Sequence, residues 1–182
     1  KHLENEFARW VSRGCKYLKF DFINAAACEG DSWYDKNITT GTMAYNYGMK
    51  ILHDLCEKHN IYLLESMAPI FPYRWGHGRR ICCDVWSNIS ESEYAMNALT
   101  WGWWTDRLYT VNDADHLVTS SSAGVTKARM TTGVCAGAFI LGDDLTDSSA
   151  QKRTKTYAGN ADINNYIRNN LGSFMPLRVT DL

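Results

Sequence analysis

Lys19 and Asp21 are separated by a single residue within the apolar run Tyr17-Leu-Lys-Phe-Asp-Phe-Ile23. Side chains of a strand alternate between its two faces, so the lysine and the aspartate share one face and the apolar residues share the other. A neighbouring cation favours the ionised form of a carboxylate, which is the form that attacks as a nucleophile. The run therefore predicts either the solvent face of a half-buried strand or two reactive groups directed into a pocket.

Acidic and amide residues also occur where four later apolar runs end. Glu65 follows residues 61–64, and Asp84 lies late in residues 81–85. Residues 108–111 and 138–141 are followed by Asn112, Asp113 and Asp115 and by Asp143 and Asp144. For any single run, a helix N-cap or a solvated loop is the favoured interpretation. Five successive runs of this kind are typical of the active-site face of a (β/α)8 barrel.

The elements that would position these residues alternate along the chain. Hydrophobic spacing predicts strands over 17–23, 61–64, 81–85, 108–111 and 138–141, and helices over 42–58, 91–104, 126–135 and 161–169. Ser90 and Glu93 predict a capping box at the second helix. This order predicts the α/β class with a parallel sheet, either doubly wound or closed as a TIM barrel. No Gly-rich phosphate-binding fingerprint follows a predicted strand, which disfavours a nucleotide-binding Rossmann fold.

Four segments, taken in order, resemble the second half of the catalytic barrel of clan D glycoside hydrolases, the α-galactosidases and their relatives in families 27 and 36. They are YLKFDFI, RRICCDVW, VNDADHL and FILGDDL, and the resemblance extends from about Trp10 to Leu145. It implies a (β/α)8 TIM barrel of which this chain covers about strands 4 to 8. It also implies a carbohydrate substrate, a terminal α-D-galactoside, hydrolysed by a retaining mechanism.

The resemblance assigns roles residue by residue. The family's Lys-x-Asp, which carries the nucleophile, matches Lys19-Phe-Asp21, and the Arg four residues before its acid/base Asp matches Arg80 and Asp84. Its Asn-Asp-Pro-Asp is similar to residues 112–115, with alanine in place of proline, and its Gly-x-Asp-Leu matches residues 142–145. The candidate substrate contacts are Lys19, Arg80, Glu65 and Asp115, and Trp75 is added to them as an aromatic surface for stacking on sugar.

A retaining glycosidase needs two carboxyl groups about 5–5.5 Å apart across the scissile bond. Asp21 would attack the anomeric carbon, and Asp84 would protonate the leaving oxygen and then activate water. Because carboxylates and water suffice, neither a metal nor an organic cofactor is expected. A cation beside Asp84 would disfavour the protonated acid, so Arg80 is expected to orient sugar hydroxyls or the nucleophile.

Several alternatives stay open. LLESMAP around Glu65 departs from the commoner family patterns, so α-N-acetylgalactosaminidase and β-L-arabinopyranosidase activities are also compatible. A second interpretation is a non-catalytic carbohydrate-binding or structural barrel segment, in which Asp21–Lys19 and Asp84–Arg80 are buried salt bridges. A third is a lyase or aldolase that uses Lys19 as a Schiff-base amine, which the neighbouring Asp21 opposes by raising the pKa of a lysine.

The family's first three strands have no counterpart here, and its barrel is usually followed by a β-sandwich. Half a barrel leaves two sheet edges open, so we expect this chain to be a segment of a longer protein or to be completed by a partner chain. Residues 1–172 are expected to form the partial barrel, and residues 173–182 are expected to begin the linker to the sandwich domain. The chain starts at Lys1, which leaves the compartment open; a secreted, periplasmic or lysosome-like location is favoured over a cytoplasmic one.

Composition narrows the class of partner. A net charge of −1 and the absence of a long apolar run disfavour a nucleic-acid or membrane partner. Six cysteines without C-x-x-C spacing predict free thiols rather than a zinc site. Aromatic residues make up 13% of the chain, and their flat faces suit sugar rings. Those that fall in predicted loops are Trp33, Tyr34, Tyr73, Trp75 and Trp86.

Overall fold

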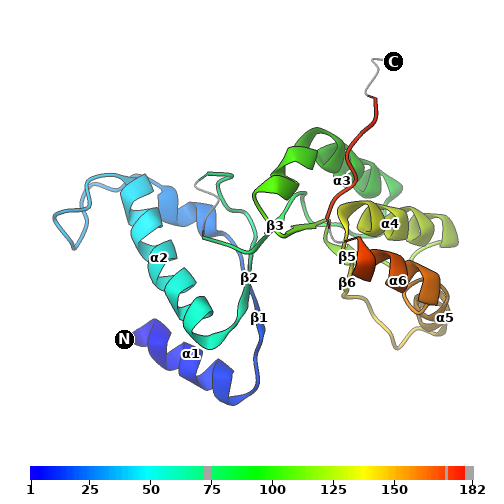
Figure 1. The fold of residues 1–182 in the computed structure, drawn as a ribbon, viewed down its shortest axis with the longest axis horizontal. Helices are drawn as coiled ribbons and strands as arrows, with labels where there is room; N and C mark the ends of the chain where they lie inside the picture. Colours follow the sequence, from blue (N-terminus) through cyan, green and yellow to red (C-terminus); the bar gives the residue numbers. More distant parts are fainter. Residues whose placement is uncertain (72–74, 171, 179–182) are drawn as a thin grey trace. The chain divides into compact units, whose positions relative to one another are not determined.

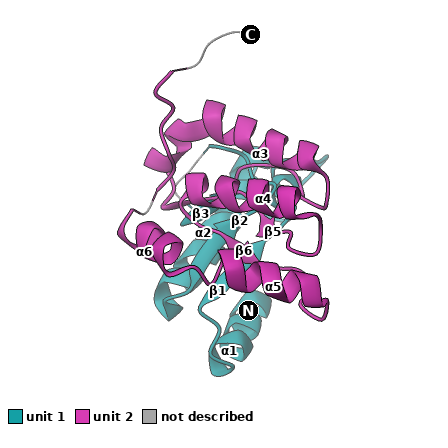
Figure 2. Cartoon of the chain, turned by 90° about the vertical axis from the view of Figure 1, so that its right-hand side faces the viewer, with its two compact units in different colours: residues 1–79 teal, residues 80–182 magenta. Residues whose placement is uncertain are grey.

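The structure is a computed structural model, and it describes residues 1–71, 75–170 and 172–178. The chain separates into two compact units, residues 1–79 (unit 1) and residues 80–182 (unit 2), as Figure 2 shows. Both units contain helices and parallel strands. The α/β class with parallel strands is therefore confirmed, and the barrel stays a prediction.

Unit 1 combines a short parallel sheet with two helices (Figure 1). The elements are α1 (His2–Ser12), β1 (Tyr17–Phe20), the 3-10 helix η1 (Ile23–Ala27), α2 (Gly41–His59), β2 (Tyr62–Glu65) and the start of β3 (Gly78–Arg80). β1 and β2 pair in parallel with Leu18 opposite Leu63, and β2 pairs with β3 with Leu64 opposite Gly78. The three carboxyl ends therefore point the same way along the sheet.

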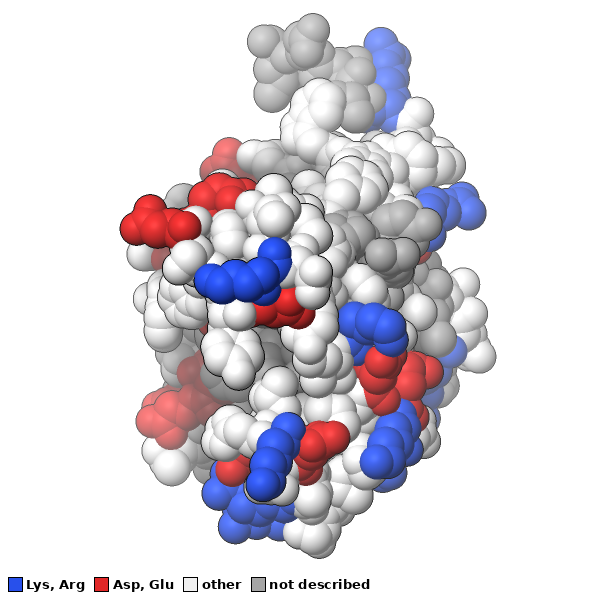
Figure 3. All heavy atoms as spheres, turned by 90° about the vertical axis from the view of Figure 1, so that its left-hand side faces the viewer, with Lys and Arg blue, Asp and Glu red and all other residues white. Residues whose placement is uncertain are grey.

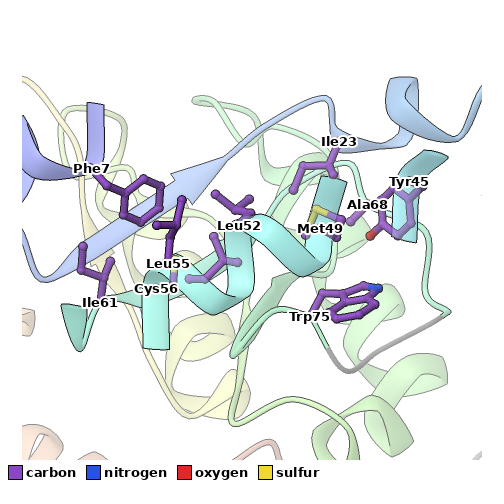
Figure 4. Close-up of a cluster of buried hydrophobic side chains, with 11 residues drawn as sticks. Phe7, Ile23, Tyr45, Met49, Leu52, Leu55, Cys56, Ile61, Ala68 and Trp75 are labelled. Carbon is purple, nitrogen blue, oxygen red and sulfur yellow. The ribbon is translucent and has the colours of Figure 1, made fainter. Parts of the chain in front are cut away.

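The core of unit 1 is built around α2. Its buried residues recur at helical spacing, at Tyr45, Met49, Leu52, Leu55 and Cys56. Figure 4 shows these side chains meeting residues from α1, from the region of β2 and from the following loop, among them Phe7, Ile61, Ala68 and Trp75. Leu18 and Phe20 of β1 pack against the same cluster. Leu18 and Phe20 are thus on the buried face, as the alternation predicts. The strand predicted over 17–23 is too long, because β1 ends at Phe20 and Phe22 is exposed.

Both ends of α2 are fixed by local interactions. The Thr40 side chain accepts a hydrogen bond from the backbone N–H of Met43, which satisfies one free donor of the first turn. Asn60 ends the helix in the left-handed conformation, with φ of 52°. Gly41 lies so close to η1 that a Cβ atom there would be 2.3 Å from the carbonyl oxygen of Ala27. The predicted helix over 42–58 is confirmed, one residue longer at each end.

Unit 2 contains mostly helices. Its elements after β3 are α3 (Ile89–Gly102), the 3-10 helix η2 (Trp103–Arg107), β4 (Val111–Asp113), β5 (His116–Leu117), α4 (Ala123–Ala136), β6 (Ile140–Leu141), α5 (Ser148–Tyr157) and α6 (Ala161–Asn169). β5 and β6 pair in parallel, with His116 opposite Ile140. Helix α4 packs against α3, β4, β5 and α5 and is therefore the central helix of this unit.

Several predicted boundaries in unit 2 are wrong. Residues 81–85 are not a strand; the strand lies earlier, at Gly78–Arg80, and Ile81 continues the pairing by donating its N–H to the carbonyl of Asp113. The strand predicted over 108–111 lies at Val111–Asp113. The capping box of α3 is formed by Asn88 and Glu91 instead of Ser90 and Glu93, because the helix begins at Ile89. The helix over 161–169 is confirmed.

The segment after α6 is attached to unit 2 as far as it is described. The backbone N–H of Ser173 donates to Asp106 at 2.8 Å, and its hydroxyl accepts a hydrogen bond from Asn112 at 2.9 Å. Phe174 donates its N–H to the carbonyl of Cys135. The rest of the predicted linker, residues 179–182, lies outside the described residues. Among the helices that the structure describes, none combines the length and apolar character that crossing a bilayer requires.

Candidate functional site

Lys19 and Asp21 lie on the exposed face of the β1 segment. Both side chains are exposed, whereas Leu18 and Phe20 are partly buried and pack on the core. Asp21 Oδ1 accepts the backbone N–H of Phe22 at 2.8 Å, and Phe22 adopts a left-handed conformation with φ of 54°. This turn ends the strand and leads into η1. A buried Asp21–Lys19 salt bridge is excluded, and the aspartate is accessible at the carboxyl end of β1.

Glu65 belongs to the interior of unit 1. It is the last residue of β2 and pairs in register with Phe20, so it lies on the core-facing side of the sheet and not on the side of Lys19. Its side chain is fully buried, and Gly76 is packed so closely that a Cβ atom there would be 2.5 Å from Glu65 Cγ. The side chain of Glu65, predicted to contact substrate, is therefore buried on the opposite side of the sheet from Lys19.

Trp75 is likewise a core residue. Only 7% of it is exposed, and its indole N–H donates to Asn46 Oδ1 at 2.9 Å. Its carbonyl accepts a hydrogen bond from His53 Nδ1 at 2.8 Å. The indole thus anchors the loop after β2 to helix α2, and it offers no free ring face for a sugar. Tyr73, the neighbouring loop aromatic, lies outside the described residues.

In unit 2 the structure brings Arg80, Asp84 and Asp115 together. The Arg80 side chain is 5% exposed, and its Nη2 donates to Asp84 Oδ1 at 3.0 Å and to Asp115 Oδ2 at 2.8 Å. The two acceptors differ in environment, because the Asp84 side chain is 73% exposed and that of Asp115 only 9%. The Arg80–Asp84 ion pair of the non-catalytic interpretation is therefore present, although its Asp84 end is exposed, and the carboxylate that shares the interior with Arg80 is Asp115.

Asp115 is held by several donors at once. The backbone N–H of Val85 donates to its Oδ2 at 2.8 Å, and His116 Nδ1 lies 3.4 Å from its Oδ1. Burial opposes ionisation of this carboxyl, but the hydrogen bonds from His116 and Val85 and the charge of Arg80 outweigh it and lower its pKa to about 2. Asp115 is therefore ionised at neutral pH and anchors Arg80, a role that differs from the predicted contact with substrate.

Arg129 of α4 is a buried cation that the sequence argument missed. It is fully buried, and its Nη2 donates to the carbonyl oxygens of Ala114 and His116. Burial lowers its pKa, although the charges of Cys82 and Asp115 act in the opposite direction. The sequence could have predicted its burial, since it shares one helical face with other residues that are buried. These are Thr126, Met130 and Gly133.

Asp143 follows β6 and forms hydrogen bonds with the segment after β5. Its carboxylate accepts hydrogen bonds from the backbone N–H groups of Thr119 and Ser120 and from the Ser120 hydroxyl. Burial opposes ionisation, but the hydrogen bonds from Ser120 outweigh it and lower the pKa of Asp143. The acidic residue at this strand end therefore orders the local backbone.

Within residues 1–71, 75–170 and 172–178, no group of three or more His, Cys, Asp or Glu side chains is arranged to hold a metal ion. All six cysteines are free thiols, as predicted. No protein-family model matches the chain, and neither a curated protein nor a solved structure matches it. The likeness to glycoside hydrolases therefore depends on the sequence segments themselves.

Proposed function

We propose that the chain is part of a retaining glycosidase barrel that hydrolyses terminal α-D-galactosides, with Asp21 as nucleophile and Asp84 as acid/base. The observation that carries the proposal is the order of the four family-like segments together with their relation to parallel strands. Asp21 directly follows β1, and Asp84 lies in the segment after β3. Reactive groups at the carboxyl ends of parallel strands are the arrangement on which barrel enzymes depend.

The proposed reaction has two displacements. A carboxylate oxygen of Asp21 forms a bond to the anomeric carbon while the bond to the leaving oxygen breaks, and Asp84 gives that oxygen its proton. Asp84 then takes a proton from water, whose oxygen attacks the anomeric carbon and breaks the ester to Asp21. The exposure of Asp21 directly after β1 and the cation of Lys19 two residues earlier support the nucleophile's role.

Arg80 fits this cycle as a positioning residue. Its contact with Asp115 is buried and supported by other donors, whereas its contact with Asp84 lies at the surface. An exposed ion pair contributes at most about 1 kcal/mol, so Asp84 leaves Arg80 at little cost when it turns to a leaving oxygen. Arg80 stays with Asp115 throughout and fixes the backbone from which Asp84 projects.

The test is release of the aryl group from an aryl α-D-galactoside by the 182-residue chain and by any longer polypeptide that contains it. Asp21→Asn and Asp84→Asn are compared with Asp54→Asn, an exposed aspartate paired with Lys50 on α2. We expect release by the unaltered protein and by Asp54→Asn, and loss with Asp21→Asn. Folded protein inactive on α-galactosyl, α-N-acetylgalactosaminyl and β-L-arabinopyranosyl substrates would overturn the proposal and favour a non-catalytic carbohydrate-binding segment.

Azide separates the two proposed roles. In Asp21→Gly, azide takes the place of the nucleophile, and the expected product is β-galactosyl azide, with inverted configuration. In Asp84→Gly, the glycosyl-enzyme still forms from a substrate with a good leaving group, and azide attack on it gives α-galactosyl azide. If the two variants gave the opposite products, the roles of Asp21 and Asp84 would be exchanged. If neither variant formed a galactosyl azide although the unaltered protein is active, both assignments would be refuted.

A further inference from the structure

The segment between η1 and α2 forms a hollow that the proposed reaction does not use. Together with the first half of α2 it borders an open hollow of about 660 Å³ within unit 1. Trp33, Tyr34 and Tyr47 lie on its wall, with Ile38 and Ala44 as apolar neighbours. Tyr34 is fully exposed, Tyr47 is 58% exposed and Trp33 is half-buried. In Figure 1 this segment is the light-blue loop beside the start of α2.

The chemistry of the wall selects a neutral polar ligand. Its charged side chains are one acid, Asp35, and one base, Lys36, so their formal charges cancel. Acidic and basic side chains are also interspersed over the face that includes this loop (Figure 3). Aromatic faces pack against the C–H faces of a sugar ring, while phenol, carboxylate and ammonium groups bond its hydroxyls. The volume falls within the roughly 300–1,000 Å³ typical of small-molecule sites.

The loop that forms the hollow is braced by its own hydrogen bonds. Asp35 Oδ1 accepts both the backbone N–H and the side-chain amide of Asn37, each at 2.9 Å. Lys36 Nζ donates to the carbonyl of Trp33 at 3.2 Å, and Ile38 donates its N–H to the carbonyl of Asp35. Because these contacts fix the aromatic side of the hollow before a ligand arrives, less ordering is needed on binding.

Gly48 is a second observation that points to the hollow. It lies inside α2, where glycine is less favourable than alanine because of its backbone entropy. Close packing does not require it, since a Cβ atom at Gly48 would meet nothing within 4 Å. At Gly41 on the same helix, by contrast, close packing does require glycine, because a Cβ atom there would collide with η1. A side chain at Gly48 would instead occupy the hollow that this residue lines.

We infer that this hollow is a binding site for a neutral saccharide, held by stacking on Trp33 and Tyr47 and by hydrogen bonds to Asp35 and Lys36. The inference goes beyond the proposed hydrolysis and does not require it, because it concerns binding alone. If both proposals hold, the substrate is an oligosaccharide with a second point of attachment on unit 1.

The test is calorimetric titration of the Asp21→Asn chain with three neutral trisaccharides, raffinose, maltotriose and cellotriose, and with anionic trigalacturonate. Asp21→Asn prevents turnover. Because raffinose ends in an α-galactosyl group that the proposed active site would also bind, binding is assigned to the hollow only where changes at Trp33 and Gly48 weaken it. We expect at least one neutral trisaccharide to bind more tightly than trigalacturonate. Adding Trp33→Ala should weaken that binding by about tenfold or more, as truncation of an aromatic anchor does.

Gly48→Leu and Gly102→Leu form a matched pair for the same titration. Both glycines are helical with open space around a Cβ atom, but Gly102 is at the end of α3 in unit 2 and does not line the hollow. Because a Cβ atom meets nothing within 4 Å at either position, both variants should fold. Gly48→Leu should abolish binding, and Gly102→Leu should leave it unchanged. Failure of every neutral trisaccharide to bind, or equal binding by Gly48→Leu, would overturn the inference.

Discussion

Unit 1 and unit 2 bury different kinds of side chain. Unit 1 has a cluster of eleven buried apolar residues, and its buried polar side chains in the described part are Glu65 and Ser66. Unit 2 has a cluster of three buried apolar residues, Leu99, Ala114 and Ala136. It buries two arginines and two aspartates as well, together with several hydroxyl and amide groups. Unit 2 also buries apolar side chains outside that cluster, among them Val85, Tyr109, Leu117 and Met130. Both units therefore bury apolar side chains, and unit 2 adds a set of buried, hydrogen-bonded charges.

This contrast predicts different sensitivities. Apolar burial depends on shape and volume and is little affected by pH. A buried ion network depends on every partner being present and ionised, because a lone buried charge is costly. A cavity should therefore weaken unit 1, whereas loss of a charge should weaken unit 2.

The largest expected effect is a cavity in unit 1. Phe7 is fully buried and packs against Trp10 in a tilted arrangement, with a centroid distance of 5.3 Å. Phe7→Ala should lower the free energy of unfolding of unit 1 by about 4 kcal/mol, from lost burial and an unfilled cavity. The measurement is amide hydrogen exchange followed by mass spectrometry across residues 1–79 and 80–182.

Leu3→Ala on the same helix is the matched control, since Leu3 is 36% exposed and should contribute less than about 1 kcal/mol. Protection in residues 80–182 should stay unchanged in both variants. Equal loss of protection in the two units would show that they unfold together and would remove the basis of the comparison.

The next effect is removal of a charge from unit 2. Asp115→Asn leaves the buried guanidinium of Arg80 with its exposed partner Asp84. We expect the free energy of unfolding to fall by about 3 kcal/mol, since the buried guanidinium loses its buried partner. Asp84→Asn is the matched control on the same guanidinium, and the exposure of Asp84 predicts a loss below about 1 kcal/mol. Urea unfolding of both variants measures the difference, and equal losses would contradict the assigned asymmetry.

The same contrast explains where the sequence predicted the structure well. In unit 1, the ends of α2 and β2 were predicted to within one residue. Tyr45, Met49 and Leu52 follow helical spacing, and this spacing places them on the face of α2 that packs in the core. The exposed face of Lys19 and the buried face of Phe20 followed from alternation. Helix α1 was missed although Leu3, Phe7, Trp10 and Val11 recur at helical spacing, and three of these residues pack in the core.

In unit 2 the sequence pattern is weaker because buried polar side chains are interspersed among the buried apolar ones. Residues 81–85 read as a strand from Ile81 and Val85, but Arg80 and Asp115 organise that segment through side-chain hydrogen bonds, which periodicity does not detect. Helix α5 was missed because its sequence is polar, and its start depends on the Asp147 side chain capping Ala150. The pairing of Arg80 with Asp115 joins residues 35 positions apart, so short-range spacing could not reveal it.

The smallest expected effect is a loss of stability in acid that is confined to unit 2. The pKa of Asp115 is about 2 in the folded chain against an ordinary value of 3.8, so its contribution is complete above about pH 5. As the pH falls through 4 toward 2, protonation of the unfolded chain removes about 2 kcal/mol of stability. Asp143 acts in the same direction, since its pKa is also lowered.

Brief digestion with pepsin at pH 4, 3 and 2 measures this effect, because pepsin cleaves segments that open at these pH values. Cleavage should increase first within residues 80–182, while residues 1–79 stay protected by the apolar cluster around Leu52 and Phe7. In Asp115→Asn the acid dependence of unit 2 should be flatter, because the group whose protonation drives it is gone. Earlier cleavage of unit 1, or an unchanged acid dependence in this variant, would show that a different set of carboxyl groups controls stability at low pH.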